Sequence, residues 1–273
     1  SLCYHKRKGE TMIGAVIGDL AGSVYEYYQF YKTQPLKIEK IFPDGAFFSD
    51  DSILTVAIAD AIINKCDYGQ KLKEYGKKFQ DYLPEGVPYF KKMFSQSFMS
   101  WLDEDTAGES KGNGAMMRIS PVGWLFNSEE EVIKNVKLAT MPSHNTSEAI
   151  DCATLVALTI FYARQGLEKD EIYQKLNLPK EKPSVTKFNY TCSDTVDLVF
   201  YSLYKGKNFE DCIKIALSFG GDTDTNACIV GSMAEAFYEV GKEFHDKALS
   251  YLPKDFVDII NRCENIINSE KER

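Results

Sequence analysis

Apolar residues recur at intervals of three and four positions along most of the chain. This spacing is typical of amphipathic helices, because it places the apolar side chains on one helix face. It predicts helices over residues 12–30, 52–64, 68–82, 129–139, 147–165, 170–176, 195–204, 209–218 and 225–244. Convincing alternation of apolar and polar residues, which would indicate strands, is absent. The predicted fold class is therefore all-α.

The helical pattern runs through the chain without a break in composition. Only the segment 179–193 is rich in Pro, Lys, Ser and Thr, and we interpret it as a surface connection within one domain. With 273 residues, of which 44% are hydrophobic, the chain can bury one large core. We predict a single domain over 11–268, preceded by an N-terminal extension over 1–10.

Charge and cysteine content exclude several classes of protein. The net charge of −8 repels phosphate backbones and anionic lipid, and so argues against a nucleic-acid partner. The seven cysteines are scattered and form no C-x-x-C pair, which indicates reduced thiols. The basic residues 5–8 and the apolar run 12–17 imitate a secretory signal, but Asp19 interrupts it, and no run approaches the roughly 20 apolar residues of a membrane span. We predict a cytoplasmic protein.

Two acidic clusters stand at predicted helix starts. In the stretch 220–225, Asp222 and Asp224 lie two positions apart and a threonine follows; in the stretch 49–52, two aspartates lie between serines. Carboxylate and hydroxyl oxygens suit hard cations such as Mg²⁺ or Mn²⁺. The alternative is that these residues only cap helices. If both clusters met in one cleft, the carboxylates would repel each other unless protons or cations neutralised them. Spacing leaves open whether they meet.

A third element lies on the first predicted helix. Gly14, Gly18, Gly22 and Glu26 share one four-residue stripe, and Asp19 lies seven positions before Glu26. Each glycine costs about 1 kcal/mol against alanine inside a helix, so the stripe indicates a close approach of another backbone. One interpretation brings the acids of this helix to the acidic clusters. The other is tight helix packing, with Glu26 solvated at the helix end.

These features, in this order, resemble the ADP-ribosylglycohydrolase family, which includes the dinitrogenase reductase-activating glycohydrolase and the ADP-ribosyl-arginine and ADP-ribosyl-serine hydrolases. The motifs that carry the resemblance are 14–19 with Glu26, 49–52, 112–118, His144, and 220–225 with Gly231. The resemblance implies a compact orthogonal multi-helical domain with a dinuclear metal cleft. It also implies an enzyme that releases ADP-ribose from a modified protein or from a small ADP-ribose conjugate.

The resemblance further implies roles for individual residues. Two Mg²⁺ or Mn²⁺ ions would be held by Ser49, Asp50, Asp51, Asp222, Asp224 and Thr225, with Asp50 and Asp224 bridging them. Glu26 would act over the scissile ribose as a catalytic group beside Asp50 and Asp51. The distal ribose and the diphosphate would be bound by Glu26, Ser110, Lys111, Gly112, Asn113, Gly114 and His144.

The chain departs from the family pattern at several of these positions. Serines stand at 49 and 52 where relatives usually carry threonine, and a serine hydroxyl can do the same ligand work. Ser110 stands where some relatives have an aspartate proposed to assist catalysis. The role of that aspartate is therefore absent here or passes to Glu109, Asp103 or Asp105. The stretch 145–148 also differs, which leaves the adenine contacts open, including the stacking aromatic residue.

Several alternatives follow from these departures. The chain could bind ADP-ribose with little catalysis, or it could be a two-metal phosphoesterase that cuts the diphosphate, since acidic clusters do not determine which bond is attacked. Among glycosidic linkages, arginine is favoured, because a guanidine that leaves protonated needs little help from a general acid. The sequence leaves open the linkage and the choice between magnesium and manganese. We predict a monomer.

Overall fold

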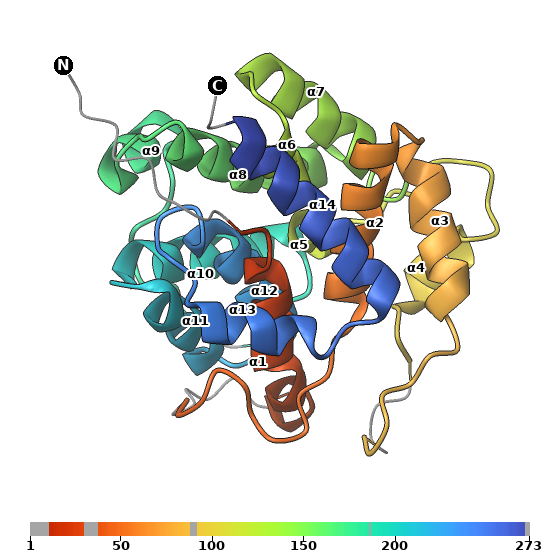
Figure 1. Cartoon of the computed structure of the whole chain (residues 1–273), viewed down its shortest axis with the longest axis horizontal. Helices are drawn as coiled ribbons and strands as arrows, with labels where there is room; N and C mark the ends of the chain where they lie inside the picture. Colours follow the sequence, from red (N-terminus) through yellow and green to blue (C-terminus); the bar gives the residue numbers. More distant parts are fainter. Residues whose placement is uncertain (1–10, 30–37, 88–91, 186, 271–273) are drawn as a thin grey trace.

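A computed structural model describes residues 11–29, 38–87, 92–185 and 187–270, and in this part of the chain helices are joined by loops, with isolated bridges in place of strands (Figure 1). The all-α prediction is confirmed. The predicted extension over 1–10 lies outside the described residues. None of the helices described is both long and apolar enough to cross a membrane.

The helices, in chain order, are α1 (Gly14–Gln29), α2 (Asp50–Asn64), α3 (Tyr68–Phe79), α4 (Gln96–Trp101), α5 (Gly114–Met117), α6 (Ser120–Leu125), α7 (Glu129–Thr140), α8 (Ser147–Arg164), α9 (Lys169–Lys175), α10 (Cys192–Lys205), α11 (Phe209–Ser218), α12 (Thr223–Ala234), α13 (Lys242–Leu249) and α14 (Lys254–Glu270). The predicted segments match α1 to α3 and α7 to α11 within a few residues. Helices α4 to α6 are too short for their periodicity to be recognised. Helix α14, which packs against α2 and α6, was not predicted although its amphipathic spacing was visible.

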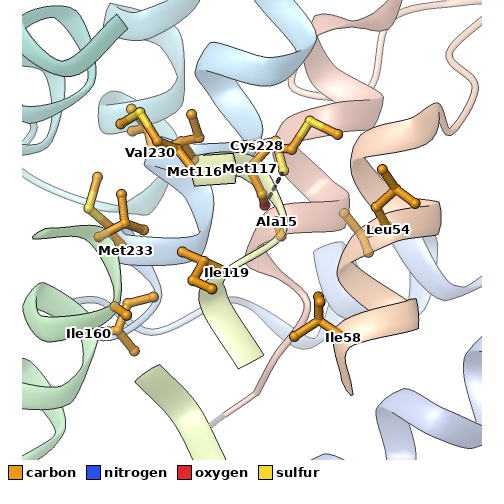
Figure 2. Close-up of a cluster of buried hydrophobic side chains, with 14 of the residues drawn as sticks. Ala15, Leu54, Ile58, Met116, Met117, Ile119, Ile160, Cys228, Val230 and Met233 are labelled. Atoms are coloured by element: carbon orange, nitrogen blue, oxygen red, sulfur yellow. Dashed lines mark hydrogen bonds between the residues drawn. The ribbon is translucent and has the colours of Figure 1, made fainter. Parts of the chain in front are cut away.

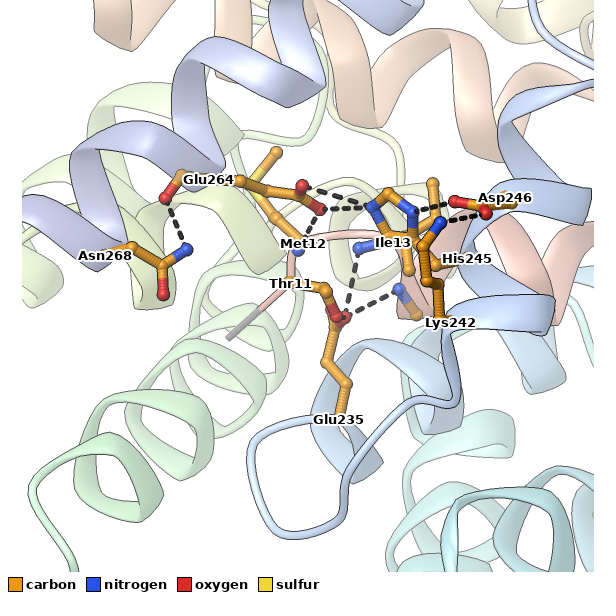
Figure 3. Close-up of polar contacts among 10 residues, drawn as sticks. Thr11, Met12, Ile13, Glu235, Lys242, His245, Asp246, Glu264 and Asn268 are labelled. Atoms are coloured by element: carbon orange, nitrogen blue, oxygen red, sulfur yellow. Dashed lines mark hydrogen bonds and ion pairs between the residues drawn. The ribbon is translucent and has the colours of Figure 1, made fainter. Parts of the chain in front are cut away.

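The prediction of one helix over 225–244 is wrong, because the chain leaves the helix after α12 and starts again at α13. A glycine, which is a poor helix former, stands at 241 as the N-cap of α13, and α12 ends at its C-cap Glu235. Its Oε2 accepts hydrogen bonds from the backbone N–H groups of Ile13 (3.0 Å) and Gly14 (2.8 Å), which are free donors at the start of α1 (Figure 3). This contact ties the end of α12 to the start of α1.

The glycine stripe of α1 packs against α12. A Cβ added at Gly14 would lie 2.3 Å from the carbonyl oxygen of Gly231, one at Gly18 would lie 2.0 Å from that of Ala227, and one at Gly22 would lie 2.3 Å from that of Thr223. The tight packing is therefore confirmed, but the expectation that Glu26 would then be solvated is wrong, because its carboxylate lies within 4.8 Å of those of Asp222 and Asp224. At Gly22 the backbone of α1 lies beside the start of α12, at Thr223 and Asp224, so the same packing brings α1 to that acid.

We expect Gly18→Ala to destabilise the protein by about 2 kcal/mol or more, because backbone atoms of α12 cannot move aside as a flexible side chain would. The change should lower Tm by roughly 4–8 °C in a thermal unfolding measurement. Gly241→Ala is the matched control, since a Cβ there meets nothing within 4 Å. An unchanged Tm for Gly18→Ala would contradict the close contact between α1 and α12.

The short helix α5 lies in the core, between α2 and α12 (Figure 2). Met116 and Met117 are buried there, and the Sγ of Cys228 on α12 donates a hydrogen bond to the carbonyl oxygen of Met117 (3.5 Å). Because α5 directly follows the glycine-rich stretch 110–114, this packing positions that loop relative to the starts of α2 and α12.

Candidate active site

The two acidic clusters converge in the folded chain, together with the acids of α1. Carboxylate oxygens of Asp19, Asp51 and Asp224 lie within 4.8 Å of one another, as do those of Glu26, Asp222 and Asp224. Asp224 is common to both groups. The sequence left this convergence open, and the packing of α1 and α2 against α12 brings it about.

Helix capping accounts for only one of the two clusters. Ser49 is the N-cap of α2, and its Oγ accepts a hydrogen bond from the N–H of Asp51 (3.2 Å). Asp222 occupies the N-cap position of α12, but its side chain makes no capping hydrogen bond. Its Oδ2 instead accepts from Nδ2 of Asn113 (2.7 Å). The carboxylate of Asp222 is therefore held toward the site by another segment.

Asp19 was not predicted as a site residue, yet it is fully buried at the start of α2. Its Oδ2 accepts from the N–H groups of Ser49 (2.8 Å) and Ser52 (3.1 Å), and its Oδ1 lies 2.8 Å from the hydroxyl of Ser49. Because both oxygens already accept hydrogen bonds, Asp19 is better suited to orienting the acidic cluster of α2 than to binding an ion itself.

Asp51 and Thr225 connect the two clusters. The Thr225 hydroxyl lies 3.2 Å from Oδ2 of Asp51, whose other oxygen, Oδ1, is buried without a hydrogen-bond partner in the described part of the chain. A buried carboxylate oxygen without a partner is costly unless a cation neutralises it. Since the surrounding donors are carboxylate and hydroxyl oxygens, the residues fit a hard divalent cation.

Burial, and for most of these acids also the charge of their neighbours, shifts their pKa values upward. Burial raises the pKa of Asp19 to about 6 and that of Asp222 to about 7, and burial with the nearby Asp19 raises that of Asp50 to about 8. Burial and the neighbouring acids also raise the pKa values of Asp51 and Asp224. Without a cation, the folded state thus favours protonated carboxyls.

We expect the metal-free protein to lose stability as pH rises from 5 to 8. Unfolded aspartates titrate near pH 4 and these folded ones near 6 to 8, so the folded chain binds more protons across this window. At pH 8, Mg²⁺ or Mn²⁺ at about 100 times its Kd should add about 2.7 kcal/mol, or roughly 5–10 °C in Tm.

The control for this prediction is metal-free, EDTA-treated protein at matched ionic strength. His245, whose pKa the hydrogen bond to Glu264 raises, adds a stability loss of the same sign, but divalent cations should not restore that part (Figure 3). A Tm at pH 8 that does not respond to Mg²⁺ or Mn²⁺ would contradict a metal site at the acidic clusters.

The acids lie at a cavity of about 860 Å³. A cavity of this size is large enough for a nucleotide-sized ligand. Its lining includes most of the predicted site residues, namely Glu26, Asp50, Ser110, Lys111, Gly112, Asn113, Gly114, His144, Asp222, Asp224 and Thr225. Ser49 and Asp51 are buried next to these residues and do not line it. Asp50 belongs to neither group of adjacent acids, so its bridging role stays a prediction.

The loop 109–114 is held between two other segments of the cavity wall. Isolated antiparallel bridges join Glu109 to His144 and Gly112 to Thr191. Asn189, which is 2% exposed, accepts from the N–H of Asp222 (3.2 Å). The interpretation of 179–193 as a surface connection is therefore wrong for its last residues, which contact Gly112 and Asp222 in the cavity wall.

The three acids that could take the role of the aspartate replaced by Ser110 lie in different places. Glu109 is exposed and lines the cavity. Asp103 pairs with Lys77 at 3.0 Å, and neither it nor Asp105 lines the cavity. The aromatic residues of the lining, which sequence reasoning did not single out, are Phe94, Phe98, Trp101 and Tyr190. No local signal distinguished them from the other aromatic residues of the chain.

Comparisons with known proteins agree with this geometry. The family model for ADP-ribosylglycohydrolase matches residues 4–260. The ADP-ribosylarginine hydrolase Tri1 of Pseudomonas putida (strain GB-1) is 21% identical over 264 residues, covering 84% of this chain and 70% of that protein. The ADP-ribosylhydrolase ARH3 of Mus musculus is 25% identical, covering 59% of this chain and 50% of its own length.

A solved structure extends the likeness to the fold. The structure of an ADP-ribosylglycohydrolase-related protein complex aligns with a TM-score of 0.62 at 16% identity and covers 94% of both chains. The resemblance read from the motifs is confirmed, since the family match spans nearly the whole chain. This protein belongs to the ADP-ribosylglycohydrolase family.

Proposed function

We propose that this enzyme uses divalent cations to hydrolyse the glycosidic bond between ADP-ribose and a modified target, and that the target atom is an arginine nitrogen. The observation that carries the proposal is the convergence of buried acids on a cavity whose wall also contains the loop 110–114 and His144. The name of the Pseudomonas relative, an ADP-ribosylarginine hydrolase, supports the choice of linkage.

Two Mg²⁺ or Mn²⁺ ions fit the donor set. Asp51 and Asp224 with the hydroxyls of Ser49 and Thr225 would hold one, and Asp222 and Asp224 would hold the other. When bound, the ions would orient the distal ribose through its hydroxyls and make a water molecule more acidic. Asn113 keeps Asp222 in place through its hydrogen bond.

Glu26 is suited to handle a proton at the ribose. The nearby Asp224, burial and Asp19 raise the pKa of its carboxyl well above the usual range. Cations at Asp222 and Asp224 would lower that pKa again, so that Glu26 could act as the carboxylate base, one of the two roles that carboxyls have in glycoside hydrolysis. The leaving guanidine of arginine is basic and can take up the proton that Glu26 would remove from the attacking water, so a separate acid in place of Ser110 is not needed.

A panel of arginine-, serine- and acetyl-linked ADP-ribose substrates, with added Mg²⁺ or Mn²⁺, tests the proposal. We expect free ADP-ribose from the arginine-linked substrate and none in the presence of EDTA. Full turnover in EDTA would contradict the metal requirement, and release only from another substrate would contradict the linkage.

The same assay separates the alternatives. AMP as the product would indicate cleavage of the diphosphate. Tight ADP-ribose binding by calorimetry, without release from any substrate, would indicate a binding module.

A further inference from the structure

His144 is linked to a buried arginine through one serine hydroxyl. Nη2 of Arg118 donates to Oγ of Ser143 (2.7 Å), and this Oγ lies 2.8 Å from Nδ1 of His144. All three side chains are buried: Arg118 is 0% exposed, Ser143 4% and His144 6%. The same Nη2 also donates to the carbonyl oxygen of Ala139 (3.3 Å).

The direction of the hydrogen bonds in this chain follows from the donor inventory. A guanidinium has donors only, so Arg118 must donate and Ser143 must accept. The remaining hydroxyl hydrogen of Ser143 is buried, and Nδ1 of His144 is the one acceptor that the described residues offer it. If Nδ1 carried a proton instead, that hydroxyl hydrogen would be buried without an acceptor, which costs about 1–3 kcal/mol.

A neutral imidazole that accepts at Nδ1 carries its proton at Nε2. The doubly protonated ring is disfavoured, because burial and the positive charge of Arg118 both hold the pKa of His144 well below its usual range. Arg118 itself stays charged at neutral pH, since burial lowers its pKa only to about 10. The ring is therefore neutral.

Nε2 faces the glycine-rich loop of the cavity. An added Cβ would lie 3.4 Å from Nε2 at Gly114 and 3.6 Å from it at Gly112. No hydrogen-bond partner of Nε2 occurs among residues 11–29, 38–87, 92–185 and 187–270. The N–H is thus available to a ligand in the cavity, which His144 lines.

We propose that Arg118 and Ser143 are positioning residues that hold His144 as the Nε2–H tautomer, so that it donates a hydrogen bond to an anionic oxygen of the ligand. On the function proposed above, on which this assignment of the ligand rests, that oxygen belongs to the diphosphate of ADP-ribose. The relay restricts a side chain with two neutral tautomers to the one that donates from Nε2, and so removes the need to select a tautomer when the ligand binds.

The tautomer is measured directly by nitrogen NMR of ¹⁵N-histidine-labelled, ligand-free protein. His144 is one of three histidines and its signals are assigned by their loss in His144→Gln. We expect a protonated Nε2 and an unprotonated Nδ1 in the unaltered protein, and a mixture of tautomers in Ser143→Ala. A protonated Nδ1 in the unaltered protein, or an unchanged spectrum in Ser143→Ala, would overturn the proposal.

A double-mutant cycle on ADP-ribose affinity tests how Ser143 acts. Glutamine at 144 offers an amide N–H near the position of Nε2 and has no tautomers. Ser143→Ala should weaken ADP-ribose binding about tenfold in the unaltered background and by less than about twofold in His144→Gln. An equal loss in both backgrounds would show that Ser143 acts through packing or through Arg118 alone, and would overturn the relay.

Ser202→Ala is the matched control, because it removes an equally buried hydroxyl that bonds only within α10, to the carbonyl oxygen of Leu198. Its ADP-ribose affinity should be unchanged. Failure of the two proposals is distinguishable: unaltered protein with the Nε2–H tautomer but without affinity for ADP-ribose would contradict the proposed function and leave the tautomer assignment standing.

Discussion

Asp224→Asn is expected to abolish the binding of divalent cations and to lower kcat/KM by about 1,000-fold or more. Asp224 is the one acid common to both groups of converging carboxylates, so its loss affects both candidate ion positions. An amide lacks the negative charge that a hard cation requires. The measurements are Mn²⁺ calorimetry and the release of ADP-ribose from the preferred substrate.

The unfolding temperature of this variant distinguishes loss of metal binding from misfolding. Because burial and the neighbouring Asp222 and Asp19 raise the pKa of Asp224, a neutral amide at this position avoids the cost of a buried carboxylate among other acids in the metal-free protein. Asp224→Asn should therefore unfold at the same or a higher temperature than the unaltered protein in EDTA at pH 8. Asp170→Asn, on the exposed surface of α9, is the control and should keep both metal binding and turnover. Retention of both by Asp224→Asn would contradict the placement of the metal site.

Glu26→Gln is expected to lower kcat by about 100-fold or more while ADP-ribose affinity and metal content stay unchanged. The amide keeps the size of the carboxyl but cannot accept a proton. Glu109→Gln is the matched control, since Glu109 lines the same cavity. We expect its kcat to fall by less than tenfold.

The position of Glu26 makes the metal measurement decisive. Its carboxylate lies within 4.8 Å of those of Asp222 and Asp224, close enough to serve as a ligand. Loss of one ion along with turnover would therefore assign Glu26 to metal binding instead of proton transfer. A normal rate would contradict any catalytic role for it.

Local sequence was sufficient for the long helices, because their apolar spacing and their capping residues act within a few positions. It was insufficient at the break after α12. There, Glu235 is bound by backbone groups of Ile13 and Gly14, more than 200 positions away in the chain. Helical spacing continues through this break, and the contact of Glu235 with the start of α1 lies beyond the reach of any local pattern.

The metal-binding side chains of the site could also be predicted from local sequence. The sequence by itself determined which side chains could bind a hard cation, since two clusters of aspartates with hydroxyl neighbours stand at helix starts, and it showed the order of motifs that marks the family. It also determined that another backbone approaches the glycine stripe, because nothing else offsets the loss of helix stability.

Only the tertiary structure decided that these clusters meet. The hydroxyl of Thr225 reaches Asp51 across 174 positions of sequence, and Asp19 anchors the start of α2 from α1. The same packing brings Arg118 and Ser143 together and so sets the direction in which His144 donates. Residue type determines what a side chain can bind, but charge repulsion, burial and hydrogen-bond direction depend on neighbours distant in sequence, which the packing of the helices supplies.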